Sequence, residues 1–327
     1  MKKLYPAIIA SICLLLITLT QANAQAYKTS FTVAQDGTGD YKTIQAAIDG
    51  CKSFPDAPTE ITIHIKKGVY NEKIIVGSWN TRLSLIGDSK DSTIITFGDF
   101  FTKVARGPNS TFLTATLNVQ ANDFTAKNLT IVNSAGAVGQ ALALSVTGTR
   151  CYFENCAMIG NQDTLYAAGE GAFQYYKNCY IEGTVDFIFG EATALFEGCT
   201  TKSKSNGGAV TAASTSQYSA YGYVFKNCSI EAAPNVTKSI LGRPWRQYAK
   251  TVFIDCKINN TITPEGWSKW AGPATGPLAF YAEYNSTGEG ANPTKRAPWT
   301  KQLTAKEAKE YTLKNIFKSN VPWSVVQ

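Results

Sequence analysis

Two aspartates occur at equivalent places in the sequence and could work as an acid–base pair. Asp163 lies seven residues after Cys156, and Asp186 lies seven residues after Cys179. If these segments are successive units of a stack, the backbones of the two aspartates are about 5 Å apart. Two ionised carboxyl groups at that distance repel by roughly 3 kcal/mol at an effective dielectric constant of about 20, so the pair should hold one proton. Such a pair offers a carboxylate nucleophile and a proton-donating carboxylic acid.

The local sequence around Asp186 is unusual in itself. Residues 184–190 read T-V-D-F-I-F-G, which is otherwise typical of a strand. Aspartate is depleted from strands because it packs poorly there and competes for backbone hydrogen bonds. Taken alone, Asp186 could simply face solvent. The equivalent Asp163 favours the functional interpretation, because a purely structural protein gains nothing from placing two carboxylates side by side.

The element that must position these aspartates is a short repeat. Five strand-like segments rich in aromatic residues end in Asn, Gly or Asp and are followed by a cysteine. These cysteines, at spacings of 23, 20, 29 and 28 residues, are Cys156, Cys179, Cys199, Cys228 and Cys256. A unit this short cannot enclose a core, so successive units must stack. Because β-branched and aromatic residues recur with almost no helical periodicity, the sequence predicts an all-β fold, a right-handed parallel β-helix.

The same repeat also indicates whether the cysteines are free thiols or form disulfides. Removal of a leader containing Cys13 would leave seven cysteines, and export would permit disulfides. Their recurrence at one position per unit instead predicts a ladder of mostly buried free thiols. One or two disulfides would also be compatible with the sequence.

Helical patterns are confined to the two ends of the chain. Residues 43–51 place apolar residues on one face and could cap the first coil, and residues 304–307 have the form of a capping box. Residues 272–299 are rich in Gly, Pro and Asn and are expected to form irregular chain along the stack. No linker or composition change divides the chain. We therefore expect a single β-helical catalytic domain over residues 26–327, with short capping helices at its ends.

The first 25 residues have the order of a secretory signal peptide. A short basic start is followed by an apolar stretch and then by the small-residue segment A-N-A-Q-A at 22–26. The apolar stretch is too short to span a bilayer comfortably, and no later segment reaches about 20 apolar residues. The sequence therefore predicts a secreted or periplasmic protein with no membrane association after removal of residues 1–25.

Charge and histidine content narrow the function classes. The formal net charge of +7 falls to about +5 without Lys2 and Lys3, and this modest excess suits an acidic polymer at least as well as nucleic acid. No cluster of Lys and Arg stands out, so we expect no nucleic-acid partner. His64, the only histidine, lies in the strand-like segment I-T-I-H-I, and no nearby motif supports a Ser-His-Asp triad or a zinc site. We therefore expect no metal and no cofactor.

Five motifs in order produce a resemblance to a known family. They are G-V-Y-N-E at 68–72, Q-A-L-A-L at 140–144, G-N-Q-D-T-L-Y at 160–166, V-D-F-I-F-G at 185–190 and L-G-R-P-W at 241–245. On these motifs the chain resembles the pectin methylesterases, or pectinesterases, of plants and microbes, from about Phe31 to Trp323. The resemblance implies a hydrolase that removes methyl esters from pectin and releases methanol and pectate. Asn161 departs from the commonest family form, which has an aromatic residue there, and this difference could alter contacts with substrate.

The resemblance also implies a role for each candidate catalytic residue. Asp186 would attack the ester carbonyl to form an acyl-enzyme, and Asp163 would protonate the leaving methoxide and then activate water. Arg243 would pair with Asp186 and keep it ionised. Gln140 and Gln162 would donate hydrogen bonds to the oxyanion. Gln140 lies 23 residues before Asp163, so by count alone it would occupy the equivalent position on the preceding coil. Its unit has a longer turn, however, so the sequence constrains this alignment less.

Other candidates would bind the polysaccharide. The residues for which the resemblance implies substrate contacts are Thr111, Gln140, Arg243, Trp245 and Trp267. The two tryptophans would present flat apolar faces to sugar rings. Tyr166 and Phe189 are weaker candidates, because strict alternation from an outward Asp186 turns Phe189 inward unless the strand bends at Gly190. The implied partner is pectin, and we expect the protein to be a monomer.

Three other functions are compatible with a β-helix that carries paired carboxylates. A β-helical glycosidase also uses two acids, but the N-T-D, D-D and G-H-G segments of polygalacturonases are absent from the sequence. Pectate lyases bind calcium through clustered acidic residues, and the sequence has no such cluster near the pair. A non-catalytic polysaccharide-binding module would have no use for an acid pair beside an arginine. Methanol release without chain shortening or an unsaturated product would distinguish the esterase.

Overall fold

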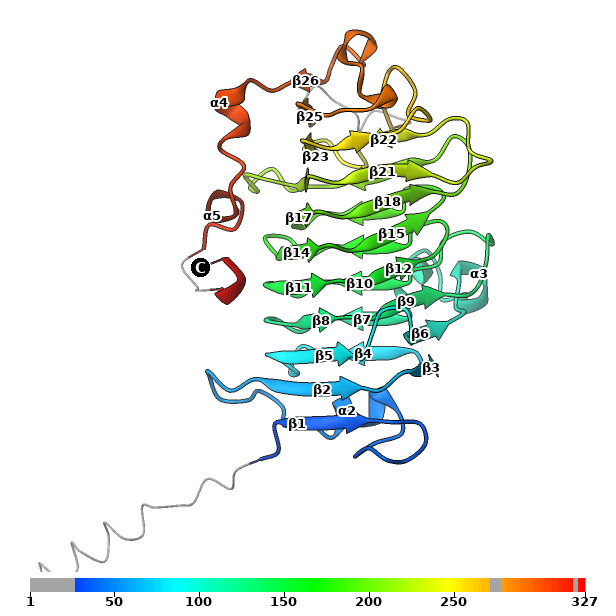
Figure 1. Cartoon of the computed structure of the whole chain (residues 1–327), viewed down its shortest axis with the longest axis vertical. Helices are drawn as coiled ribbons and strands as arrows, with labels where there is room; N and C mark the ends of the chain where they lie inside the picture. The colour runs from blue at the N-terminus through cyan, green and yellow to red at the C-terminus, as the bar shows by residue number, and fades with distance from the viewer. Residues whose placement is uncertain (1–26, 271–277, 320–322, 327) are drawn as a thin grey trace, which may run out of the picture.

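The computed structural model describes residues 27–270, 278–319 and 323–326, which form one stack of parallel coils (Figure 1). The predicted signal peptide and the first residue of the predicted domain lie outside the described residues. A typical coil contributes one strand to each of three sheets, and the pairings between successive coils are parallel. The predicted parallel β-helix is therefore confirmed.

The three sheets run the length of the stack. Sheet A contains, in spatial order, β1 (Ser30–Val33), β2 (Ile61–Ile65), β5 (Leu83–Gly87), β8 (Thr125–Lys127), β11 (Cys151–Glu154), β14 (Phe173–Lys177), β17 (Thr193–Glu197), β20 (Tyr223–Lys226), β23 (Lys250–Ile254), β25 (Phe280–Tyr284) and β26 (Lys301–Gln302). Sheet B contains β3 (Gly68–Asn71), β6 (Thr93–Phe97), β9 (Thr130–Asn133), β12 (Ala157–Ile159), β15 (Tyr180–Gly183), β18 (Thr200–Ser203), β21 (Ser229–Ala232) and β24 (Lys257–Ile258). Sheet C contains β4 (Ile74–Val76), β7 (Leu117–Val119), β10 (Leu144–Val146), β13 (Leu165–Ala167), β16 (Ile188–Gly190), β19 (Ala209–Ala213) and β22 (Ile240–Gly242).

The corner between sheets A and B explains the residue that precedes each cysteine of the repeat. Asn155, Asn178 and Gly198 occupy this corner on successive coils with φ of 51°, 53° and 61°. Asparagine and glycine tolerate this left-handed conformation better than other residues, so they can turn the chain within one residue. The asparagine side chains also connect neighbouring coils, since Asn155 Nδ2 donates to Asn128 Oδ1 at 2.8 Å.

Inside the stack, aromatic rings from successive strands of sheet A lie face to face. Phe196 is stacked on Phe225 with ring centroids 4.4 Å apart, and Phe225 is stacked on Phe253 at the same distance. In-register parallel pairing places one ring of each coil directly over the next. The core is therefore repeated coil by coil, which is why the sequence repeat was visible.

The cysteines form the predicted buried ladder. Those of the described residues are all free and buried, including the five that follow the corner residues. A thiol of one coil contacts the backbone of the preceding coil, as where Cys228 Sγ lies 3.3 Å from the carbonyl oxygen of Phe196. The alternative of one or two disulfides is thus wrong for the cysteines that the structure describes.

Short helices lie at the two ends and beside sheet C. They are α2 (Ile44–Asp49), α3 (Phe101–Val104), α4 (Ala305–Ala308), α5 (Leu313–Ile316) and the 3-10 turns η1 (Ser110–Leu113), η2 (Glu289–Ala291), η3 (Pro293–Lys295) and η4 (Ser324–Val326). The predicted first helix is confirmed as α2, which buries Ile44, Ala47 and Ile48. The predicted capping box is present at the start of α4, where Thr304 and Glu307 bond reciprocally. Of the segment 272–299, residues 272–277 lie outside the described residues, and residues 278–299 are more regular than expected, because β25 adds a strand to sheet A.

Candidate active site

The two aspartates lie just before neighbouring strands of sheet C. Asp163 precedes β13 and Asp186 precedes β16, and Leu165 of β13 pairs with Ile188 of β16. The predicted interval of 23 residues between equivalent positions is therefore confirmed. Neither aspartate belongs to a strand, because both adopt left-handed backbone conformations, with φ of 65° and 50°. Each side chain is less than a tenth exposed, so two carboxyl groups lie close together in a nearly buried site.

Arg243 fixes one of these carboxyl groups. It follows β22 two coils beyond Asp186, where its backbone N–H donates to the carbonyl of Thr211. Its Nε donates to Asp186 Oδ1 at 2.9 Å and its Nη2 donates to Oδ2 at 2.7 Å. This two-bond geometry holds both carboxylate oxygens in one plane and is among the stronger ion-pair arrangements.

The two carboxyl groups consequently differ in proton affinity. Burial, and then repulsion from Asp186, raises the pKa of Asp163 well above its ordinary value, despite the opposing charge of Arg243. Burial also raises the pKa of Asp186, but the hydrogen bonds and charge of Arg243 oppose that effect directly. The shared proton therefore belongs on Asp163, and Asp186 is the group that ionises first.

Two glutamine side chains belong to the same region. Gln140 pairs with Gln162 across adjacent coils, and the backbone N–H of Ala141 donates to the carbonyl of Gln162 at 3.1 Å. The count that aligned Gln140 with Asp163 is therefore wrong by one residue. The longer turn in the coil of Gln140 absorbs the difference, so Gln140 matches the neighbour of the aspartate instead of the aspartate itself.

A cavity of about 510 Å³ opens over these residues. The candidates that line it are Thr111, Gln140, Gln162, Asp163, Asp186, Arg243 and Trp245. The structure thus brings together seven of the eight main candidates from the sequence, and Phe189, one of the two weaker candidates, lines the same cavity. The cavity is also lined by Phe112, Trp270 and Arg246, which sequence reasoning missed.

Aromatic rings form a continuous row along this cavity. Phe112 contacts Tyr166 with centroids 4.9 Å apart, Tyr166 contacts Phe189 at 4.8 Å, and Phe189 contacts Trp245 at 5.8 Å. Phe189 therefore faces the cavity, contrary to simple alternation from Asp186. The left-handed backbone at Asp186 interrupts the alternation before the strand begins, and Gly190 at the end of the strand also has a positive φ, of 124°.

Trp267 is the candidate that lies elsewhere. Its backbone pairs with Gly242 at the end of sheet C, which directs the indole into the core. There Trp267 Nε1 donates to Glu283 Oε1 at 3.0 Å, and the side chain is 2% exposed. Trp270 lines the cavity instead, with the guanidinium of Arg243 over its ring at 4.3 Å. Because this segment lacks the repeat pattern, the sequence did not indicate which tryptophan faces outward.

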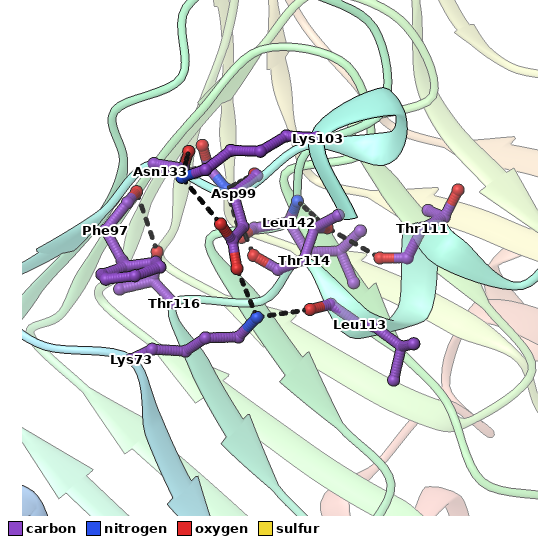
Figure 2. A network of polar contacts seen from close by, with 11 residues as sticks. Lys73, Phe97, Asp99, Lys103, Thr111, Leu113, Thr114, Thr116, Asn133 and Leu142 are labelled. Carbon is purple, nitrogen blue, oxygen red and sulfur yellow. Dashed lines mark hydrogen bonds and ion pairs between the residues drawn. The ribbon is translucent and has the colours of Figure 1, made fainter. Parts of the chain in front are cut away.

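A buried polar network holds the loop that carries Thr111 (Figure 2). The Thr114 hydroxyl donates to the Thr111 carbonyl at 2.7 Å and accepts from the backbone N–H of Leu142 at 3.0 Å. Asn133 Nδ2 in turn donates to the carbonyl of Leu142 at 2.9 Å. These bonds attach the turn η1 to sheets B and C, and so fix one wall of the cavity.

Within residues 27–270, 278–319 and 323–326, no group of three or more His, Cys, Asp or Glu side chains is arranged to hold a metal ion. None of the helices there is both long enough and apolar enough to span a membrane.

Comparisons with known proteins extend the resemblance over most of the chain. The profile of the family described as Pectinesterase matches residues 30–320. A probable pectinesterase/pectinesterase inhibitor 23 of Arabidopsis thaliana is 38% identical over 299 residues, which are 87% of this chain and 51% of that protein. The chain spans about half the length of the curated relatives it matches.

Solved structures agree in fold. A pectin methylesterase from carrot superposes with a TM-score of 0.83 at 32% identity, covering 90% of this chain and 95% of that one. A pectin methylesterase in complex with a hexasaccharide gives a TM-score of 0.77 at 30% identity, covering 91% and 99% of the two chains. Taken with the stacked coils and the paired aspartates, these matches show that the chain belongs to the pectinesterase family.

Proposed function

We propose that this protein is a pectin methylesterase, a carboxylic ester hydrolase that converts methyl-esterified galacturonate residues of pectin to free acids and releases methanol. The observation that carries the proposal is the unequal pair of buried aspartates. Asp186 is bound by both donors of the Arg243 fork, while Asp163 has no hydrogen-bonded arginine among the described residues and a strongly raised pKa. One carboxylate is thereby prepared for attack and one carboxylic acid for proton donation.

The first half of the reaction uses both groups. The ionised Asp186 attacks the ester carbonyl carbon, and the carbonyl becomes a tetrahedral oxyanion. Gln140 and Gln162 lie on adjacent coils beside the pair and donate side-chain N–H groups to that oxyanion. The tetrahedral centre then collapses: the bond to the methoxy oxygen breaks, Asp163 transfers its proton to that oxygen, and methanol leaves. An anhydride between Asp186 and the galacturonate remains.

The second half restores the enzyme. Asp163, now ionised, removes a proton from water, and the resulting hydroxide attacks the anhydride. The acyl bond to Asp186 breaks, the galacturonic acid unit is released and loses its proton to solvent, and Asp163 again carries a proton, the one taken from water. Arg243 stabilises the Asp186 carboxylate as the leaving group of this step.

The rest of the cavity suits a polysaccharide. Trp245 and Trp270 line it beside the pair, and flat aromatic faces of this kind pack against sugar rings. Thr111 adds a polar contact. The related pectin methylesterase that binds a hexasaccharide supports an oligosaccharide ligand for this groove. We further propose that the mature protein begins near residue 26, is exported, and acts as a single-domain monomer.

The test is an assay of methanol release from highly methyl-esterified pectin, with polygalacturonate as the control substrate. We expect methanol in proportion to new carboxylate groups, with no fall in chain length and no unsaturated product. Shortening of the polymer would instead indicate a glycosidase, and an unsaturated product would indicate a lyase. Binding without any of these products would indicate a polysaccharide-binding module.

A further inference from the structure

A second cavity, of about 420 Å³, lies beside the first and contains positive charge that the proposed chemistry does not use. Lys73, Lys103 and Arg106 line it, together with a single carboxylate, that of Asp99. Phe112 lines both cavities, so the two are contiguous. With both lysines and the arginine charged and Asp99 ionised, this second cavity carries a net charge of about +2.

The lysines are held in place by the protein itself (Figure 2). Lys73 Nζ donates to Asp99 Oδ2 at 2.5 Å and to the carbonyl oxygen of Leu113 at 2.6 Å. Lys103 Nζ forms an ion pair with Asp99 Oδ1 at 2.9 Å and donates to the carbonyl of Gly98 at 2.9 Å. Burial disfavours ionisation of Asp99, but the bonds from the two lysines outweigh it and lower the pKa of that carboxyl group.

This arrangement leaves donors for a ligand. An ammonium group has three N–H donors, and each lysine uses two of them on protein acceptors among the described residues. Arg106 is exposed, and within the described ranges its guanidinium has no hydrogen bond or ion pair. Both ammonium groups also lie over the ring of Phe97, 5.9 and 5.4 Å from its centroid. A ligand carboxylate could therefore bind to the three cations without displacing any of these hydrogen bonds or ion pairs.

The apolar part of the second cavity also fits a sugar acid. Ile75 and Leu113 line it and are 46% and 43% exposed, unusually high values for such side chains. A pyranose ring presents C–H groups on its faces, and such faces pack against exposed apolar side chains. Cations beside an apolar surface are thus complementary to a ring that bears a carboxylate.

The position of this cavity along the stack sets the distance between the two sites. The first cavity lies at β13 and β16, whereas the second lies at β4 and β7 of the same sheet. From β13 to β4 there are three strand spacings of about 4.8 Å, or on the order of 14 Å. A polysaccharide lying along sheet C would reach both cavities, with few sugar units between them.

We propose that the second cavity is a distal subsite for a free galacturonate carboxylate in the same polymer chain whose methyl ester lies at the aspartate pair. This inference rests on the proposed function. It makes the enzyme favour pectin that is already de-esterified some units away from the ester being cleaved. The product of one turnover thereby becomes part of the recognised substrate for the next.

The test measures binding of an unesterified oligogalacturonate long enough to span both cavities, by calorimetry, in the absence of turnover. Arg106→Gln should weaken binding about fivefold, and Arg106→Lys, which keeps the charge, should weaken it less. Lys103→Gln is a second variant and should also weaken binding of the oligogalacturonate. Lys314→Gln, an exposed lysine on α5, is the matched control and should bind like the wild type.

Further measurements distinguish a distal subsite from nonspecific binding of anions. Unesterified digalacturonate, which is too short to span both cavities, should bind more weakly than the long oligomer, because it can occupy only one cavity at a time. Equal affinity for the short and the long oligomer, competition by sulfate as strong as that by the oligomer at matched ionic strength, or wild-type affinity in Arg106→Gln would each overturn the subsite. If the wild type releases no methanol from pectin but binding of the long oligomer still depends on Arg106, the proposed function fails and the subsite stands.

Discussion

Two aspartates at equivalent positions on adjacent coils differ in proton affinity because one arginine binds only one of them. Asp163 and Asp186 have equivalent backbone conformations on adjacent coils, yet only Asp186 receives the Arg243 fork. Without Arg243, the pair would be nearly symmetric and the shared proton would have no preferred oxygen. The chemical asymmetry of the site thus comes from a coil two strands away in sheet C.

Substitution of the two aspartates should separate their tasks. Asp186→Asn replaces the nucleophile with a neutral amide, so turnover on methyl-esterified oligogalacturonate should fall by at least about a thousandfold, roughly 4 kcal/mol in the barrier. Asp163→Asn should also be severely impaired, because the leaving methoxide has lost its proton donor. Both variants should fold, because asparagine tolerates the left-handed conformation at these positions.

An activated aryl ester then distinguishes the roles, provided that the wild type accepts it. Its leaving group needs no proton, so part of the activity should return in Asp163→Asn and none in Asp186→Asn. Asp255→Asn, at an exposed corner with the same type of backbone conformation, is the matched control and should retain wild-type turnover. Rescue of Asp186→Asn instead would show that the assignment is reversed.

The raised pKa of Asp163 also predicts how stability depends on pH. In the unfolded chain Asp163 ionises near pH 4, whereas in the folded protein it keeps its proton to higher pH, so stability is lost as pH rises between those two values. Each tenfold difference in proton affinity between the folded and the unfolded chain changes the free energy of unfolding by about 1.4 kcal/mol. Asp163→Asn should therefore melt above the wild type at pH 8, with a smaller difference at pH 4. An equal difference at both pH values would argue against a raised pKa.

The corner between sheets A and B is the feature that makes one coil resemble the next. A single left-handed residue there follows the sheet A strand, and the sheet B strand begins two residues later, after the cysteine. Asparagine side chains at this corner bond to one another between coils, as in the pair Asn155 and Asn128. The corner therefore constrains both the direction of the chain and the register of the stack.

Substitution of a corner residue tests this account. Asn155→Ala removes the bond to Asn128 and places a residue with a Cβ but no polar group in the left-handed region, which should cost about 1–2 kcal/mol of unfolding free energy. Asn155→Gly loses the same bond but fits the backbone, so it should be more stable than the alanine variant. Chemical denaturation of both variants gives the comparison. Equal stabilities would mean that the backbone conformation contributes nothing.

The sequence predicted the parts of the molecule that repeat. The interval of 23 residues located Asp163 and Asp186 on adjacent coils because the two coils have turns of equal length. The prediction of the Gln140 register was wrong where a turn is longer, and the outward placement of Trp267 was wrong where the repeat pattern ends. The basic cavity could not be predicted, because Lys73 and Lys103 meet only after the intervening chain has formed one strand in each of the three sheets.

At the scale of the whole chain, the C-terminal segment returns along the stack and covers the outer face of sheet A (Figure 1). Ile316 and Phe317 pack against an apolar cluster contributed by four adjacent strands, namely Tyr152, Tyr175, Leu195 and Val224. Lys226 Nζ adds a hydrogen bond of 2.9 Å to the carbonyl of Tyr311. Coils that otherwise contact only their neighbours are thereby joined across several repeats.

Removal of one side chain from this contact should destabilise the protein. Phe317→Ala deletes a ring that is 4% exposed and contacts Phe173 and Tyr175, so the loss should be on the order of 3 kcal/mol. Phe54→Ala is the matched control, because Phe54 is 66% exposed, and its melting temperature should stay close to that of the wild type. Equal melting temperatures for the two variants would show that the C-terminal segment adds no stability.

The same covering segment determines when folding can be completed during synthesis. Tyr152 and Tyr175 leave the ribosome well before Ile316 and Phe317, and their coils can pair as soon as both are present. Until Ile316 and Phe317 have been translated, the apolar strip on sheet A is exposed to other chains, which is a condition that favours aggregation. Nascent chains that stall before residue 316 should therefore depend on chaperones more than completed ones do.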